Sequence, residues 1–405
     1  MKLSIIIPSY WGRKAGEPFN EDDAVYDHPT PIDSEGTLGR ALESIRLLDY
    51  DDFRVVVLGA ATHPSLVVPM EQRLKEIVGP FRRDFPVIYL GPSHLSRIWE
   101  LMELGGGGAY RDMLSLRGYS NIRNCCLAAA CLTDADAAVL FDDDEVYEDA
   151  EYLRKVSQSI GDVFESSFVW GLAGYYVNAD GNYFLPENRD WVYSEWPAVK
   201  AMNEAFKIIE SGDRLKITPW VFGGNMVIHR NLYTRLAFDP NITRGEDIDY
   251  LINARLLGYY FFLDSRLWIR HLAPVKTAPK WRRFREDVDR FLYTRAKLGS
   301  QNPELAGWRR VEVKELDPYP GRFLKDDLEN MIFRTSLLLG LDCLSRGDRR
   351  GFEESMANLE RSSADWGPEY NPYQWYVDFR GRWENYMDFL ASSREIRDYV
   401  TGLYA

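Results

Sequence analysis

Short apolar runs alternate with segments of helical periodicity in the first third of the chain, and this pattern constrains the fold most. Helical spacing of apolar residues appears at 36–49 and 65–79. The apolar runs are residues 3–10, 53–61, 85–91 and 136–144. Continuously apolar strands between helices predict a parallel sheet covered on both faces. Ligands bind such sheets at the carboxyl ends of the strands, where we expect Ser9, Gly59 and Asp142 to gather.

The length of 405 residues exceeds the size that one hydrophobic core comfortably supports. After about residue 280 the pattern becomes helical and aromatic, as in YQWYVDFRGRWENYMDF. We therefore predict an α/β domain over residues 1–280 and a helical subdomain over residues 281–405. The aromatic stripes of the second part suit core packing, or subunit packing in a homo-oligomer.

Charge and composition exclude several classes of function. The net charge of −13 opposes general nucleic-acid binding, which needs a dominant basic surface. No run of about 18 apolar residues occurs, so no transmembrane segment is predicted. The cysteines lack disulfide or zinc spacing and fit free thiols in a reducing compartment; they are Cys125, Cys126, Cys131 and Cys343. We expect a cytoplasmic protein.

Four consecutive acids follow the last apolar run, in the segment AAVLFDDDEVYED. In an extended chain Asp142 and Asp144 would share one face and repel each other unless a cation lay between them. Hard oxygen ligands suit Mg²⁺ or Mn²⁺. A solvated turn is the alternative interpretation of this spacing alone, and Glu145 is expected to begin such a turn.

An apolar strand followed by DxD, in a chain that opens IIIPSY, resembles the GT-A glycosyltransferases, in particular family-2-type enzymes and relatives of mannosylglycerate synthase. The resemblance implies a Rossmann-like GT-A domain in which a divalent metal bridges the diphosphate of a nucleotide sugar. Asp142 and Asp144 would be the metal pair, with Asp143 directed toward the ribose or donor sugar. The remaining implied donor contacts near the strand ends are Pro8, Ser9, Tyr10 and Gly59.

Two further stretches match this family in order along the chain. RGYSNIRNCCLAAA (117–130) implies donor contacts from Arg123 and Asn124, with an ordinary capped helix start as the alternative. WVFGGNMVIHR (220–230) resembles the acceptor-side loop, and a tight turn before a strand is its alternative. The acceptor-side residues implied are Gly223, Gly224 and Asn225.

The motif TRGEDIDYLINAR (243–255) resembles the ED motif of family-2 enzymes, which makes Glu246 and Asp247 the catalytic candidates. Asp247 would deprotonate the acceptor in an inverting enzyme; an acidic first helical turn is the alternative. His271, after an apolar run, would be the third metal ligand or a structural histidine. Lys276, with Arg282 and Arg283, would contact the diphosphate or belong to a solvated helix start.

The sequence thus predicts a metal-dependent enzyme that moves a hexose from a GDP- or UDP-linked donor to the hydroxyl of a soluble acceptor, a small hydroxy acid or a saccharide. It departs from the family in three places: VVVLGAAT lacks an acidic pair for the base, the insertion 11–35 has no counterpart, and the spacing after GED is not an ungapped match to the catalytic segment of mannosylglycerate synthase. Retaining and inverting chemistry both stay open. A haloacid-dehalogenase-type phosphatase and a non-catalytic carbohydrate-binding protein on this fold are the alternatives.

Overall fold

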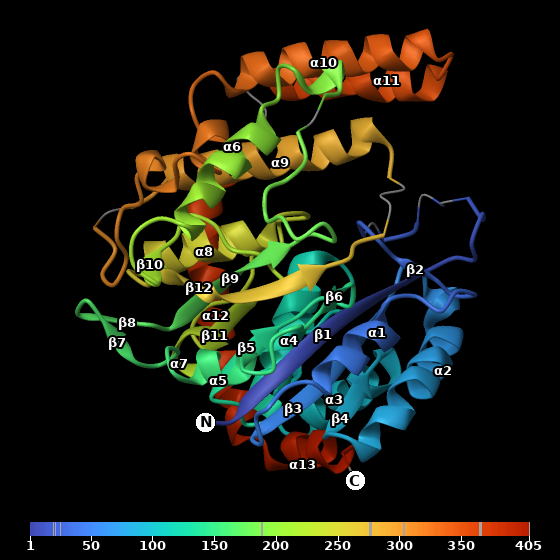
Figure 1. Cartoon of the computed structure of the whole chain (residues 1–405), viewed down its shortest axis with the longest axis vertical. Helices are drawn as coiled ribbons and strands as arrows, with labels where there is room; N and C mark the ends of the chain where they lie inside the picture. The colour runs from blue at the N-terminus through green and yellow to red at the C-terminus, as the bar shows by residue number, and fades with distance from the viewer. Residues whose placement is uncertain are drawn as a thin grey trace.

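One mixed sheet organises the molecule, with strands in the order β10-β12-β9-β11-β5-β1-β3-β4 (Figure 1). The computed structural model describes residues 1–404 except 19, 21, 25, 188, 275–277, 303 and 364–366. The strands of this path are β1 (Leu3–Gly12), β3 (Phe53–Ala61), β4 (Val87–Leu90), β5 (Ala137–Leu140), β9 (Gly171–Val177), β10 (Leu215–Ile217), β11 (Met226–His229) and β12 (Phe261–His271). All run in the same direction except β10 and β11.

Helices cover both faces of this sheet, which confirms the predicted α/β class with its mostly parallel sheet. The helices before residue 280 are α1 (Leu38–Ile45), α2 (Val67–Val78), α3 (Pro92–Leu104), α4 (Tyr119–Leu132), α5 (Tyr152–Ser157), α6 (Ala198–Phe206), α7 (Arg230–Tyr233) and α8 (Glu246–Leu256). The short strands β2 (Thr30–Pro31) and β6 (Glu145–Val146) pair with β1 and β12, while β7 (Val163–Phe164) and β8 (Ser167–Phe168) form a separate hairpin.

The sheet opens between β1 and β5, and Pro8 marks the opening. Pairing of the two strands ends at Ile6 and Leu140, where the Phe141 N–H donates to the Ile6 carbonyl at 3.1 Å. The next position of β1 on this side is Pro8, which has no N–H to offer. The strand predicted over 136–144 therefore ends at Leu140, and the acids after it lie outside the sheet.

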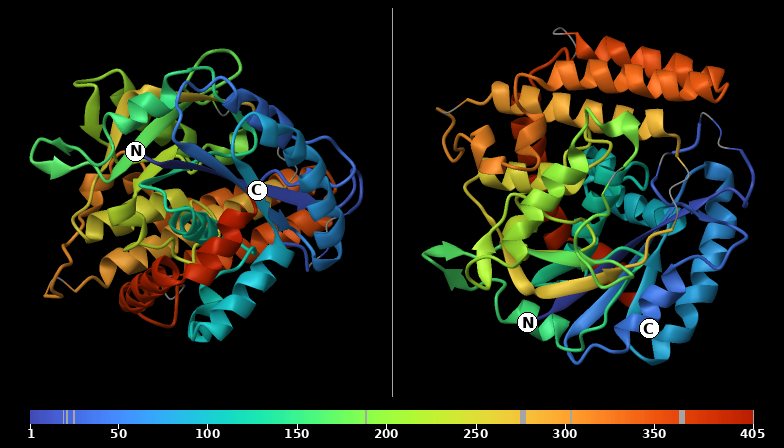
Figure 2. Two further views of the ribbon diagram at one scale, coloured as in Figure 1. Left: turned by 90° about the horizontal axis from the view of Figure 1, so that it is seen from below. Right: turned by 45° about the horizontal axis from the view of Figure 1, so that its top comes forward.

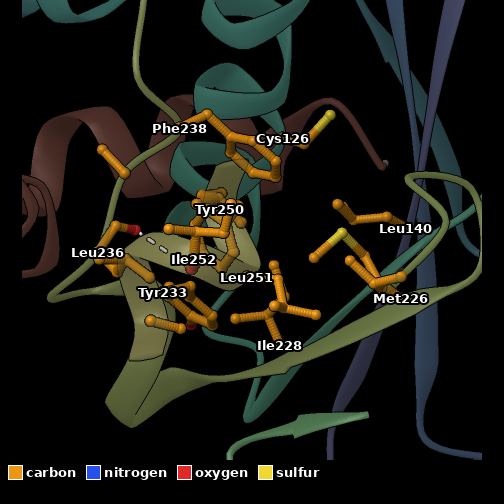
Figure 3. Packing of buried hydrophobic residues seen from close by; sticks show 14 of the residues in the cluster. Cys126, Leu140, Met226, Ile228, Tyr233, Leu236, Phe238, Tyr250, Leu251 and Ile252 are labelled. Atoms are coloured by element: carbon orange, nitrogen blue, oxygen red, sulfur yellow. Dashed lines mark hydrogen bonds between the residues drawn. The ribbon is translucent and has the colours of Figure 1, made fainter. Parts of the chain in front are cut away.

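The C-terminal region is helical, as predicted, and shares its core with the sheet. It contains α9 (Lys280–Gly299), α10 (Leu328–Ser345), α11 (Arg349–Ala357), α12 (Pro372–Ser392) and α13 (Arg394–Gly402). Trp383 and Tyr386 of α12 belong to the same apolar cluster as Cys126 of α4 and Tyr250 of α8, part of which Figure 3 shows. The boundary at residue 280 stays a prediction, because one core extends across it.

The ends of the molecule differ in character. Helices α10 and α11 pair side by side at one end, whereas both termini lie at the other (Figure 2).

The four cysteines are buried free thiols, in agreement with the prediction. Among the described helices, none combines the length and apolarity that crossing a lipid bilayer requires.

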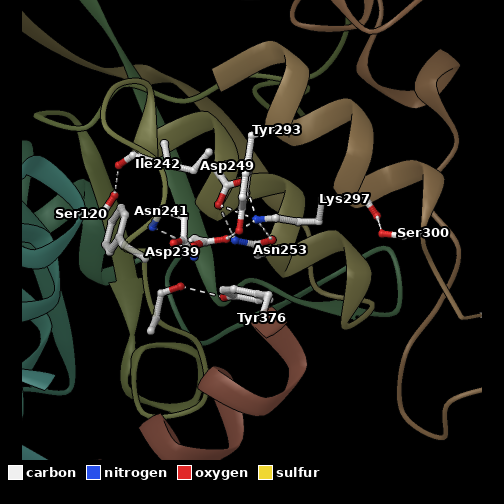
Figure 4. A network of polar contacts seen from close by, with 12 residues as sticks. Ser120, Asp239, Asn241, Ile242, Asp249, Asn253, Tyr293, Lys297, Ser300 and Tyr376 are labelled. Carbon is white, nitrogen blue, oxygen red and sulfur yellow. Dashed lines mark hydrogen bonds and ion pairs between the residues drawn. The ribbon is translucent and has the colours of Figure 1, made fainter. Parts of the chain in front are cut away.

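A buried ion-pair network joins α9 to α8 (Figure 4). The Nζ atom of Lys297 lies 2.7 Å from Asp239 Oδ2 and 2.8 Å from Asp249 Oδ1, and the lysine side chain is 0% exposed. The hydroxyl of Tyr293 donates to Asp239 Oδ2 at 3.0 Å, and Asn253 donates to Asp249 Oδ2 at 2.6 Å. Because Asp249 lies in the first turn of α8, this network fixes the helix that begins with Glu246 and Asp247.

We predict that Lys297→Ala lowers the free energy of unfolding by about 3–5 kcal/mol, because it leaves two carboxylates buried without their cation. The matched control is Lys207→Ala, which removes a 64% exposed lysine paired with Glu204 and is expected to cost less than about 1 kcal/mol. Chemical denaturation of both variants measures the difference. Equal losses would contradict a stabilising role for the network.

Candidate functional site

The acidic segment forms a turn rather than an extended strand. The Glu145 N–H donates to the Asp142 carbonyl at 3.2 Å, and the Asp142 N–H donates to Glu145 Oε2 at 2.9 Å. This turn sends the side chains of Asp142 and Asp144 to different partners. The expected alternation of the two carboxylates on one extended face is therefore not found.

Asp142 is held by Arg123 of α4. The Nη1 and Nη2 atoms of Arg123 lie 2.9 and 3.2 Å from the two carboxylate oxygens of Asp142. The Nε atom of the same guanidinium donates to Glu246 Oε1 at 3.2 Å. Arg123 is 4% exposed. Burial lowers its pKa, but the charges of Asp142 and Glu246 outweigh that effect and raise the pKa well above the usual value.

Asp144 faces His271 at the end of β12. The distance between Asp144 Oδ2 and His271 Nε2 is 3.4 Å. Strand pairing sets this contact, because His271 lies opposite Glu145 in the β12–β6 ladder. The imidazole also stacks on the Tyr176 ring, with centroids 4.7 Å apart. Burial raises the pKa of Asp144, but the hydrogen bond and charge of His271 prevail and lower it.

The geometry of Asp144 and His271 suits two ligands of one divalent ion. Donor atoms that each bond an ion at about 2.0–2.3 Å lie less than about 4.6 Å apart, as these two do. Asp142 is paired with Arg123 in this structure, so its predicted role as a metal ligand stays a prediction. Within the described part of the chain, no group of three or more Asp, Glu, His or Cys side chains is placed to share a metal. Of the expected trio, Asp144 and His271 are the two whose side chains lie together.

Asp143 and Glu145 point into the protein, each with its own partner. Ser9 Oγ donates to Asp143 Oδ2 at 2.7 Å and accepts from Trp11 Nε1 at 3.0 Å. Burial, with the charge of Asp144, raises the pKa of Asp143 to about 8. Glu145 is 0% exposed, so the expected solvated position is wrong. Burial is also the main cause that raises its pKa well above the usual value.

The glycine pair 223–224 is required by close approach of these charged groups. A Cβ on Gly223 would lie 2.5 Å from Arg123 Nη2, and a Cβ on Gly224 would lie 2.1 Å from Glu145 Oε1. The Gly224 N–H donates to the Tyr176 hydroxyl at 3.1 Å. This turn therefore forms one wall of the acidic site, the name used below for the acids 142–145 with Arg123, Asp247 and His271. The turn is the segment for which acceptor contacts were predicted.

Asp247 lies beside this wall at the start of α8. Its Oδ2 accepts the Gly223 N–H at 2.9 Å, and its Oδ1 accepts the Ile248 N–H at 2.8 Å. Burial raises the pKa of Asp247. Burial and the charge of Asp247 also raise the pKa of Glu246 to about 7. Gly245 precedes the pair in a left-handed conformation, with φ of 71°.

Several predicted contact residues have structural partners instead. Asn124 exchanges two hydrogen bonds of 2.8 Å with the backbone of Phe238, and Asn225 donates to the Tyr175 carbonyl at 2.9 Å. A Cβ on Gly59 would lie 2.3 Å from Leu74 Cδ1 of α2, so this glycine serves helix packing. The roles of these three residues as donor or acceptor contacts stay predictions. Lys276 lies outside the described residues.

The insertion 11–35 supplies site residues that the sequence did not reveal. Tyr26 of the insertion packs against Tyr10 and Tyr119, with ring centroids 4.4 and 5.2 Å apart. Arg244 Nη2 donates to Asp27 Oδ2 of the insertion at 3.2 Å, one residue before Gly245. The charge of His28 also lowers the pKa of Asp144. The polar, proline-containing composition indicated a loop, and only the fold brings it to the acidic turn.

Comparison with known proteins gives structural similarity at low identity. No protein-family model and no curated protein matches the sequence. The mannosyltransferase PcManGT from Pyrobaculum calidifontis, in complex with GDP-Man and Mn²⁺, is 13% identical over 96% of this chain and 86% of that chain, with a TM-score of 0.49. TarS 1-349 from S. aureus, in complex with UDP, is 14% identical over 89% and 90%, with a TM-score of 0.41.

A third similar structure is GalNAc-T7 with UDP, GalNAc and Mn²⁺, which is 10% identical over 82% of this chain and 56% of that chain, with a TM-score of 0.40. Similarities of this size do not carry an activity over to this chain. The functional conclusion therefore rests on the residues of the acidic site.

The pKa of Glu246 predicts a pH dependence of stability. The folded state raises this pKa from 4.5 to about 7, so protonation stabilises the folded chain. The contribution is complete below pH 4.5 and is lost as the pH rises through about 7, a change of about 3 kcal/mol. The parent chain loses this contribution between pH 4.5 and pH 8, whereas Glu246→Gln has no carboxyl group to titrate. We therefore expect the difference in unfolding free energy between the two to shift by this amount in favour of the variant over that pH range.

Urea denaturation at several pH values measures this difference. The control is Glu204→Gln, which changes an exposed carboxylate paired with Lys207 and should show no comparable trend. If the stability difference for Glu246→Gln stays constant with pH, Glu246 does not titrate as the structure implies.

Proposed function

We propose that the chain is a metal-dependent GT-A glycosyltransferase that moves a hexose from a GDP- or UDP-linked donor to the hydroxyl of a soluble acceptor. The observation that carries the proposal is the Asp144–His271 pair beside the Asp247-bound glycine turn. Asp144 and His271 are suited to bind a cation, and Asp247 lies at the start of α8. These groups lie at the carboxyl ends of the parallel strands, where ligands bind such sheets.

Asp144 and His271 are the residues that would hold a Mn²⁺ or Mg²⁺ ion. Such an ion would offset the negative charge of the departing nucleoside diphosphate. The chain itself prepares the two ligands, because the β12–β6 ladder and the stack on Tyr176 orient His271. Oriented ligands lose less conformational entropy on binding.

Arg123 acts as a positioning residue in this proposal. It joins the turn after β5 to the start of α8 through Asp142 and Glu246. Its guanidinium is neutralised by these carboxylates, so its role is to fix the spacing between the cation pair and Asp247. Substitution at Gly223 would displace it, since the two groups are already in contact range.

Asp247 is the candidate base toward the acceptor. Both carboxylate oxygens accept backbone N–H groups, and each oxygen retains a second lone pair for an acceptor hydroxyl. In an inverting reaction Asp247 would take the hydroxyl proton. In a retaining reaction it would orient the acceptor, and the donor phosphate would take that proton.

The phosphatase alternative gains no support from the geometry, because it needs Asp142 as a free nucleophile and Arg123 binds that carboxylate through two nitrogens.

Calorimetric titration of GDP, UDP and their hexose derivatives with and without Mn²⁺ tests the proposal. We predict binding that Mn²⁺ strengthens, and a loss of this strengthening by at least about tenfold in Asp144→Ala and His271→Ala, because each variant removes a metal ligand. The control is Asp213→Ala, which removes an exposed carboxylate that is not part of the candidate site. This variant should bind the nucleotide with the same strengthening by Mn²⁺ as the parent chain. Metal-indifferent binding, or none, would contradict the proposal.

A further inference from the structure

A second charged feature lies at the other edge of the sheet, where three arginines line a cleft of about 510 Å³. Arg54 is the second residue of β3, and Arg82 and Arg83 end the short helix 79–83 that leads to β4. In β3 Arg54 lies five positions before Gly59, which is about 17 Å along the strand. The cleft is therefore distinct from the acidic site, which lies beyond the carboxyl ends of β1 and β5.

The three guanidinium groups of this cleft have no acidic partner among the described residues. Asp84 is the acidic residue that lines the cleft, and it accepts hydrogen bonds of 2.9 and 2.7 Å from Nε and Nη2 of Arg46. Arg46, which also pairs with Glu43, therefore binds this carboxylate, and the three arginines of the cleft face one partly offset acid. Arg82 and Arg83 are exposed, and Arg54 lies over the Tyr404 ring at 5.4 Å from the centroid.

The positive charge of the cleft contrasts with the composition of the chain. The chain has 62 acidic and 49 basic residues, and its other arginines commonly pair with acids, as Arg46 does with Glu43 and Asp84. Like charges that share a concave surface repel each other and create a positive potential there. A bound anion would relieve this repulsion, so the cleft has the electrostatics of an anion site.

The chemistry of the lining narrows the class of anion. Planar guanidinium groups bind phosphate oxygens through paired hydrogen bonds. The Thr401 hydroxyl donates to the Arg397 carbonyl at 2.7 Å, so the arginines are the anion donors of the cleft. Tyr404 adds an aromatic ring whose hydroxyl donates to the Val55 carbonyl at 3.3 Å. The volume exceeds that of a single phosphate and falls in the range of small-molecule sites.

We propose that the cleft lined by Arg54, Arg82 and Arg83 binds a small ligand that carries a diphosphate or a similarly charged phosphate group. The site needs no divalent metal, because its positive charge comes from the arginines. It also does not depend on the proposed function, since none of its residues belongs to the acidic site.

Calorimetric titration with inorganic pyrophosphate in EDTA tests the cleft without the metal-dependent donor site. We expect binding that weakens as NaCl is raised, and an affinity at least about tenfold lower when Arg82→Ala and Arg83→Ala are combined. The control is Arg97→Ala on α3, an exposed arginine paired with Glu100, which should bind pyrophosphate normally. Asp144→Ala should also bind it normally, which separates this site from the donor site.

Hydrogen exchange with mass spectrometry locates the bound anion. Pyrophosphate should slow exchange in peptides covering 79–90 and 394–404, and this protection should be absent in the double variant. Three results would overturn the proposal: no pyrophosphate binding in EDTA, equal affinity in the double variant, or protection confined to residues 140–147. Circular dichroism of the double variant verifies that its fold is retained.

Discussion

The ion bridge from Arg123 to Asp142 and Glu246 is the interaction on which the candidate site depends. It crosses between α4, the turn after β5 and the start of α8, which are otherwise separate parts of the chain. Removing either carboxylate would leave a buried guanidinium partly uncompensated, which is costly in a low-dielectric interior. The bridge also requires Gly223, because a larger residue would occupy the space of the guanidinium. The position of the Arg123 guanidinium and the glycine at position 223 therefore depend on each other.

Several acidic side chains lie around this bridge, and their burial shifts the pKa of some of them. Asp143 and Glu145 are held inside by Ser9 and by the backbone of the turn, and burial raises the pKa of both. The pKa of Asp144 is lowered, because His271 lies beside it. The four acids of the run therefore divide into one arginine partner, two inward-facing groups and one carboxylate suited to a cation.

The sequence predicted the strands β1, β3 and β4 and the helices α1 and α2, because continuous apolar runs and helical periodicity depend on local residues. It also singled out Arg123, Asp144, Asp247 and His271 through motifs. It could not reveal that Asp142 turns toward Arg123, since that depends on where β5 ends. The burial of Asn124 and Asn225, and the arrival of the insertion at the site, depend on tertiary contacts that no local pattern carries.

The most direct test of the account is anomalous diffraction at the manganese edge, from crystals of the chain soaked with Mn²⁺ and UDP or GDP. We predict one manganese peak bonded to Asp144 and His271, with Asp142 still paired to Arg123. A nucleotide bound at the acidic turn with no manganese on that pair, or manganese and nucleotide bound together at another place, would contradict it.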